Sequence, residues 1–313
     1  MATQKYGDML PKRQLGNTGL TVPILSLGGY GLGKVRADMT DQMAIETVRY
    51  ALEQGLNYID TSPMYFESER RIGIALADVK RESIVLSTKV GSDPQRRGDY
   101  SWDGTMWNID NSIKRLGTDY FDLVLVHDPD TLTPDGLRPV LAPNGALEAL
   151  EDLKAQGVVK AIGLGQRNLE FHRIAIESGR FDVILTYRDY NPISQAAFST
   201  VLPLAEKNGV GVINGTVMMY GVLSGLSPEH FHQVKLQEWE YKRASRLYEF
   251  CQKKHIPVQA IAWGFCFRQE LIDCNLTGAR RIDQLKQNLE AAVFPISDAV
   301  WAEFEDLKLG ELF

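Results

Sequence analysis

Short apolar segments alternate with helical patterns along most of this chain, and this alternation limits the folds that it can adopt. Eight segments are rich in Val, Ile and Leu, which is typical of strands buried on both faces of a parallel sheet. They span residues 23–29, 56–60, 83–90, 121–127, 159–165, 181–187, 209–215 and 270–278. The clearest helical patterns lie between them and each ends on a glycine. These cover residues 40–55, 145–157, 169–179 and 201–209.

Eight strands with helices between them predict an α/β fold of the (β/α)8 TIM-barrel type. A doubly wound sheet is the alternative, but the glycine cluster at residues 28–33 lacks the G-x-G-x-x-G spacing and no helical pattern follows it. No linker or shift in composition divides the chain, so we expect one domain over residues 1–313. Residues 12–23, with Asn17 and Gly19 in the turn, predict a hairpin that caps the barrel bottom.

The bulk properties exclude several classes of partner. The formal net charge of −6 argues against binding to nucleic acid or to an anionic membrane. We find no apolar run of about 18 residues that would predict a membrane span and no apolar N-terminal segment that would predict a secretory signal. The three cysteines have no CxxC spacing, which predicts reduced thiols in the core of a cytoplasmic protein.

The stretch NYIDTSPMYFESER, residues 57–70, raises a question about chemistry. Its apolar segment ends on Asp60, and Tyr65 follows in a loop of turn-forming residues. The next two strands end near Lys89 and His127. Because active sites of such barrels lie at the carboxyl ends of the strands, these four side chains are expected to converge.

Each of the four residues also has an ordinary structural explanation. Asp60 can cap a loop, His127 can be a satisfied core histidine, and Tyr65 can be a loop aromatic. A lysine at the end of a buried strand needs a carboxylate partner, and Asp60 is the candidate for Lys89. The whole set is suited to proton transfer at a carbonyl or hydroxyl carbon.

In that chemistry the Lys89 ammonium would lower the pKa of the Tyr65 phenol, because a nearby positive charge favours the phenolate. A neutral His127 would bind and orient the substrate oxygen. None of these side chains accepts a hydride, so a redox reaction at this site would need a nicotinamide. No metal site is indicated.

Four motifs then resemble the aldo-keto reductase superfamily, in the family's order and over nearly the whole length. They are YIDTSPMYFESERRIG (58–73), LSTKVG (86–91), IKRLGTDYFDLVLVHDPD (113–130) and LTGARRIDQLKQNLEAA (276–292). The resemblance implies a catalytic tetrad of Asp60, Tyr65, Lys89 and His127, with Tyr65 as the proton donor or acceptor. It also implies a monomer or a weak homo-oligomer that acts on a small-molecule sugar or aldehyde.

The same resemblance implies a nicotinamide cofactor, NAD or NADP. The implied cofactor-binding residues are Gly29, Tyr30, Gly165, Gln166, Gly215, Gly278, Ala279, Arg280, Gln284 and Asn288. Members that prefer NADP often carry Lys-Ser where this chain has Gly278-Ala279, and Arg where it has Gln284, so NAD is favoured here. Arg280 or Arg281 can still meet a 2′-phosphate.

Departures from the family pattern indicate a subgroup. Gly165 replaces a serine, Gln166 replaces an asparagine, and Gly215 stands where an aromatic stacks on the nicotinamide. These features resemble the dehydrogenases that oxidise L-galactose, L-fucose or D-arabinose (D-threo-aldose) at C1 to a lactone, and also pyridoxal 4-dehydrogenase. The alternatives are an NADPH-dependent aldehyde or ketone reductase and a non-enzymatic accessory like the potassium-channel β-subunits.

Substrate specificity is expected to depend on long loops such as residues 128–145. Phe66 stands where the family motif has a glycine and is expected to narrow the mouth of the pocket. The other candidate pocket residues are aromatic, namely Tyr30, Trp102, Trp107, Tyr220 and Phe313.

Overall fold

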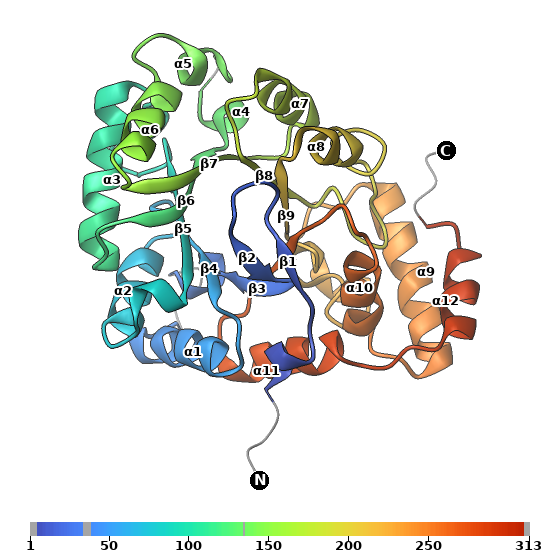
Figure 1. Cartoon of the computed structure of the whole chain (residues 1–313). Coiled ribbons are helices and arrows are strands. Elements are labelled where there is room, and N and C mark those ends of the chain that lie inside the picture. The colour runs from blue at the N-terminus through green and yellow to red at the C-terminus, as the bar shows by residue number, and fades with distance from the viewer. Residues whose placement is uncertain (1–4, 34–38, 134, 310–313) are drawn as a thin grey trace.

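Eight parallel strands close into a barrel in the computed structural model, which describes residues 5–33, 39–133 and 135–309 (Figure 1). They are β3 (Leu25–Gly28), β4 (Tyr58–Asp60), β5 (Val85–Val90), β6 (Phe121–His127), β7 (Val159–Gly165), β8 (Val183–Tyr187), β9 (Gly211–Gly215) and β10 (Cys274–Thr277). The strands pair in chain order, and β10 closes on β3. Each of the eight apolar segments contains one strand, so the prediction of a (β/α)8 barrel is confirmed.

Helices surround the barrel (Figure 1). They are α1 (Asp41–Glu53), α2 (Ser68–Leu76), α3 (Trp102–Leu116), α4 (Pro129–Leu132), α5 (Arg138–Leu141), α6 (Ala146–Ala155), α7 (Leu169–Ser178), α8 (Leu202–Asn208), α9 (Glu238–Lys254), α10 (Val258–Phe267), α11 (Ile282–Ala292) and α12 (Asp298–Glu305). Short 3-10 helices are η1 (Tyr6–Asp8), η2 (Gly29–Leu32), η3 (Arg81–Ser83), η4 (Met219–Gly221) and η5 (Pro228–Phe231). The four helical patterns are confirmed as α1, α6, α7 and α8. Within the described ranges, no helix has the length and apolar content needed to cross a membrane.

A hairpin covers the amino-terminal end of the barrel, as predicted. Strands β1 (Lys12–Gln14) and β2 (Thr21–Pro23) pair antiparallel, and Figure 1 shows them in front of the barrel opening. The backbone N–H of Asn17 donates to the Gly209 carbonyl at 2.8 Å. The Arg13 guanidinium donates to the carbonyls of Phe267 and Gln269 at 2.8 and 2.6 Å. These bonds fix the hairpin to the loops that precede β9 and β10.

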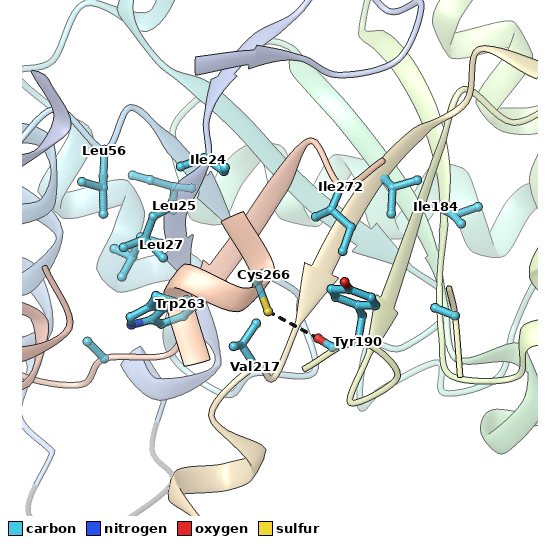
Figure 2. Close-up of a cluster of buried hydrophobic side chains, with 14 of the residues drawn as sticks. Ile24, Leu25, Leu27, Leu56, Ile184, Tyr190, Val217, Trp263, Cys266 and Ile272 are labelled. Atoms are coloured by element: carbon cyan, nitrogen blue, oxygen red, sulfur yellow. Dashed lines mark hydrogen bonds between the residues drawn. The ribbon is translucent and has the colours of Figure 1, made fainter. Parts of the chain in front are cut away.

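The core has two layers. Inside the barrel, Leu15 of the hairpin packs with inward-facing strand residues such as Tyr58, Leu123 and Ile213. A larger outer layer lies between the strands and the helices, and Figure 2 shows Trp263 and Cys266 among its side chains. The Cys266 thiol donates to the Tyr190 carbonyl at 3.6 Å. All three cysteines are buried and free, as expected from their spacing.

Candidate active site

The carboxyl ends of β4, β5 and β6 bring Asp60, Lys89 and His127 to one end of the barrel. Asp60 and His127 are the last residues of their strands, and Lys89 is the second-last of β5. The Lys89 Nζ lies 2.6 Å from Asp60 Oδ2 and donates to the Thr61 carbonyl at 2.7 Å. Both charged side chains are almost fully buried, with exposed fractions of 1% and 3%. A buried ion pair of this kind needs further hydrogen bonds to offset its desolvation.

Those further bonds come from a second polar chain behind the pair. The Ser87 hydroxyl donates to Asp60 Oδ1 at 2.7 Å, and the Tyr58 hydroxyl lies 3.0 Å from Ser87 Oγ. Both oxygens of Asp60 are therefore engaged, one by an ammonium and one by a hydroxyl. The charge of Lys89 is balanced at short range, and the side chain is held in one position.

Tyr65 lies beside Lys89. The Lys89 Nζ is 4.9 Å from the centre of the ring, and the ring meets those of Tyr30 and His127 edge-on at 5.3 and 5.7 Å. Burial raises the pKa of Tyr65 well above its ordinary value, and the carboxylates of Asp60 and Asp128 raise it further. The net shift of this pKa is therefore upward, opposite to the direction that the Lys89 charge alone would give.

His127 is held by two serines that the sequence interpretation did not identify. Its Nδ1 lies 3.1 Å from Ser62 Oγ and 2.8 Å from Ser92 Oγ, and the two hydroxyls are 3.1 Å apart. The other ring nitrogen, Nε2, lies 3.6 Å from Asp128 Oδ2. Burial holds the pKa of His127 well below its ordinary value, and the Lys89 charge lowers it further. A neutral imidazole with its proton on Nε2 fits these partners, since a carboxylate only accepts.

One cavity of about 1350 Å³ joins these residues to the region of α11. This volume exceeds the usual range of about 300–1000 Å³ for small-ligand pockets and leaves room for a long ligand together with a small one. Most of the sequence-predicted site residues line it. They are Gly29, Tyr30, Asp60, Tyr65, Lys89, His127, Gly165, Gly215, Tyr220, Gly278, Ala279, Arg280, Gln284 and Asn288.

Three aromatic residues proposed for the pocket are not brought to the cavity. Trp102 is the first residue of α3, and its indole N–H donates to Asp152 of α6 at 3.2 Å. Trp107 lies under the guanidinium of Arg96 at 5.6 Å. Phe66 is 61% exposed and does not line the cavity. The position of these residues along the chain did not show that their side chains lie away from the cavity. Phe313 lies outside the described residues.

The residues present fit a nicotinamide dinucleotide. Gln166 at the end of β7 is fully buried, and its Oε1 has no hydrogen-bond partner among the described residues, which suits a ligand amide as donor. At the far end of the cavity, a side chain on Gly278 would meet no atom within 4 Å. Gln166 itself is not among the residues that line the cavity, whereas the backbone at Gly278 is open toward it.

The sequence interpretation did not assign a role to two further residues of the site. Tyr187 ends β8 beside Gly215, its partner in β9, and a Cβ on Gly215 would lie 3.2 Å from Tyr187 Cβ. An aromatic ring from the neighbouring strand thus occupies the side of the cavity where Gly215 supplies none. Asp128, directly after His127, also lines the cavity. No group of three or more possible metal ligands occurs in the described part of the chain.

The model of the aldo/keto reductase family matches residues 24–308 of this chain. The chain is 30% identical to D-threo-aldose 1-dehydrogenase of Pseudomonas sp, over 93% of this chain and 95% of that protein. It is 31% identical to pyridoxal 4-dehydrogenase of Microbacterium luteolum, with the same coverage of both chains. Among solved structures, an aldo-keto reductase from Pseudomonas aeruginosa superposes with a TM-score of 0.68 at 27% identity, over 93% of this chain and 96% of that one.

Proposed function

Because the chain belongs to the aldo/keto reductase family of NAD(P)-dependent oxidoreductases, we propose that it oxidises an aldose at C1 to the lactone, with Tyr65 as general acid and base. The observation that carries this proposal is that the cluster of Tyr65, Lys89, His127 and Asp60 lines one cavity together with the polar side chains of Asp128 and Tyr187. One relative of similar length acts on D-threo-aldose, which is a substrate of this class.

The side chains around the reacting carbon have distinct tasks in this proposal. A bound nicotinamide supplies the hydride acceptor. Tyr65 and His127 lie edge to face on the cavity wall and together bind the oxygen of the reacting carbon. Since the pKa of Tyr65 is raised and that of His127 is lowered, both are neutral at pH 7 and both donate hydrogen bonds to that oxygen.

Oxidation also requires an acceptor for the hydroxyl proton of the substrate. The phenolate form of Tyr65 is that acceptor, and the Lys89 ammonium, whose Nζ lies 4.9 Å from the centre of the Tyr65 ring, stabilises the phenolate once it forms. The raised pKa of Tyr65 makes this form scarce at neutral pH. We therefore expect the rate of oxidation to increase with pH, whereas reduction of an aldehyde uses the protonated phenol and falls as pH rises.

NAD is the proposed cofactor. Gly278 has no side chain to bind a 2′-phosphate, and the side chain of Gln284 accepts from the Arg280 backbone N–H at 3.0 Å. The Arg281 guanidinium makes two bonds of 3.0 Å to Asp283, whose carboxylate would repel a phosphate. A fluorescence titration with NAD and NADP tests this choice. Tighter binding of NADP, lost in Arg280→Ala, would show that Arg280 recognises the phosphate.

The activity is tested with aldoses, pyridoxal and simple aldehydes, each with both cofactors and in both directions, followed at 340 nm. We expect reduction of NAD with an aldose, a lactone product trapped by hydroxylamine, and turnover lowered by roughly 10²-fold or more in Tyr65→Phe. Turnover of aldehydes alone in the reducing direction would favour the reductase alternative. Absence of any turnover with the whole panel would favour the non-enzymatic alternative.

A further inference from the structure

Asp128 is a partly buried carboxylate that lines the cavity and that the catalytic cluster does not use. It follows His127 directly and adopts a left-handed backbone conformation, with φ of 44°. Its backbone N–H donates to the Gly165 carbonyl at 2.8 Å, which fixes the residue between β6 and β7. The side chain is 15% exposed, and it lines the cavity. An aspartate tolerates this backbone conformation better than most residues, but strain at such a site often accompanies function.

The carboxylate of Asp128 has few polar contacts for its burial. The Tyr187 hydroxyl donates to Oδ1 at 3.4 Å, and His127 Nε2 lies 3.6 Å from Oδ2. Both contacts are longer than an ordinary hydrogen bond. A carboxylate has about four acceptor positions, so much of its capacity is left open toward the cavity among the described residues. Asp60, by contrast, has a short bond on each oxygen, at 2.6 and 2.7 Å.

The ionisation of Asp128 agrees with this incomplete pairing. Burial raises the pKa of its carboxyl to about 6, and the Asp130 charge adds to the increase, while Lys89 and the Tyr187 hydroxyl partly oppose it. The carboxylate is therefore charged at neutral pH and is stabilised too weakly by its protein neighbours. Hydrogen-bond donors of a bound ligand would stabilise the charged carboxylate.

We propose that Asp128 accepts hydrogen bonds from substrate hydroxyl groups beside the reacting carbon and so makes this cavity selective for polyhydroxylated substrates. The inference rests on the proposed function for the identity of the reacting carbon. The position of Asp128 supports this role. Its Oδ2 lies 3.6 Å from Nε2 of His127, which binds the reacting oxygen in that proposal. A group on the adjacent carbon of a sugar thus lies within reach of the carboxylate.

Other ligand chemistries fit this wall less well. A substrate carboxylate or phosphate would face the charge of Asp128 directly. A cationic substrate would meet Lys89 and Arg188, which line the same cavity. Neutral hydroxyl groups satisfy the acceptor and suffer neither repulsion, and Tyr187 offers a further hydroxyl beside it.

The test compares glyceraldehyde with propanal, which have the same carbon chain but differ by two hydroxyl groups. Reduction of both is measured in the wild type, Asp128→Asn and Asp128→Ala, with Asp130→Asn as the matched control for loss of one carboxylate in the same loop. We expect kcat/KM for glyceraldehyde to fall about 10- to 100-fold in the Asp128 variants, the scale of a hydrogen bond to a charged group. For propanal, and for both substrates in Asp130→Asn, we expect changes below about threefold.

An unchanged ratio of the two kcat/KM values in both Asp128 variants, or an equal fall for both substrates, would overturn the proposal. This pair also separates the inference from the proposed function, because aldehyde reduction is measured whether or not an aldose is oxidised. Isothermal titration with the aldose panel gives the same comparison without turnover. Binding that is lost in Asp128→Ala supports the role, whereas equal binding in both proteins, or no binding to the wild type, contradicts it.

Discussion

The chain reverses direction at both ends of this barrel, but different residues adopt a positive φ in the turns at the two ends. At the amino-terminal end, five helices return to a strand through a glycine with positive φ, at residues 55, 117, 157, 179 and 209. At the carboxyl end, several loops after strands use residues with a side chain in that conformation. These are Phe66 after β4, Asp128 after β6, Arg188 after β8 and Thr216 after β9.

The chemistry of the two ends differs in the same way. The amino-terminal end is closed by the hairpin, where Leu15 and Val22 are fully buried against apolar strand residues. The carboxyl end is an open cavity with a buried ion pair, a neutral histidine and a poorly paired carboxylate. Residues that carry a side chain in the left-handed conformation therefore gather at the end that faces the ligand, whereas the helix-to-strand turns at the other end use glycine. Substitutions at the two ends should separate activity from stability.

The largest expected effect lies at the cavity end. Tyr65→Phe removes the proton donor but keeps the ring, which packs against Tyr30 and His127. We expect turnover to fall by roughly 10²- to 10⁴-fold, with an unchanged melting temperature and unchanged cofactor affinity. Steady-state kinetics, differential scanning calorimetry and a cofactor titration measure the three quantities. Retention of near wild-type turnover would remove Tyr65 from the mechanism.

The opposite pattern is expected at the hairpin end. Leu15→Ala leaves a cavity at a fully buried position that plugs the barrel, which should lower the free energy of unfolding by about 2–5 kcal/mol. Urea unfolding measures the loss, and kcat of the folded variant should equal that of the wild type. A fall in kcat with normal stability would show that the hairpin influences the cavity, and the contrast between the two ends would then be too simple.

The sequence predicted both ends of the barrel to different degrees. Strand positions, the hairpin and the approach of Asp60 to Lys89 followed from apolar segments and from the rule that carboxyl ends of parallel strands share one edge. The two serines at His127 did not follow, because they come from the separate loops after β4 and β5. The position of Tyr187 beside Gly215 did not follow either, because it depends on the register between β8 and β9.

The net direction of the Tyr65 pKa shift was not predicted, for a related reason. Burial of the phenol raises its pKa, and the carboxylates of Asp60 and Asp128 add to the increase, but the sequence does not show how deeply a loop tyrosine is buried. Trp102 and Trp107 of α3 were wrongly assigned to the pocket, because the sequence does not show which face of this helix is turned toward the cavity.

A smaller effect on stability is expected at Asp128. Its folded pKa of about 6 lies above the value of about 3.9 for an unfolded chain, so the native state holds its proton more tightly. This protonated form favours folding below about pH 4, and the advantage is lost as the pH rises through about 6. The loss at pH 7 is on the order of 1–3 kcal/mol.

Asp128→Asn cannot ionise and should avoid that loss. We expect the difference in unfolding free energy between this variant and the wild type to shift in favour of the variant between pH 4 and pH 7. The charged and titratable groups that face Asp128, namely Asp130, Lys89, His127 and Tyr187, remain in both proteins. Asp135→Asn, an exposed position in the same loop, is the control and should give no such shift. If the unfolding free energies of the Asp128 variant and the wild type change with pH in parallel, the carboxylate of Asp128 is well paired in the native state.

The smallest expected effect concerns the backbone itself and has opposite signs at the two ends. Gly117 has φ of 64°, and an added Cβ would meet no atom within 4 Å, so Gly117→Ala isolates the conformational penalty of about 1–2 kcal/mol. Phe66 has φ of 50° and is 61% exposed, so Phe66→Gly removes the same strain with little loss of packing. Since glycine also increases the entropy of the unfolded chain, the net gain should be only about 0.5 kcal/mol. Gly157→Ala, at another open glycine, repeats the first measurement. If both alanine variants destabilise while Phe66→Gly stabilises, the cavity end carries strain that the hairpin end avoids; a Phe66→Gly protein less stable than the wild type would mean that its loop pays no conformational penalty.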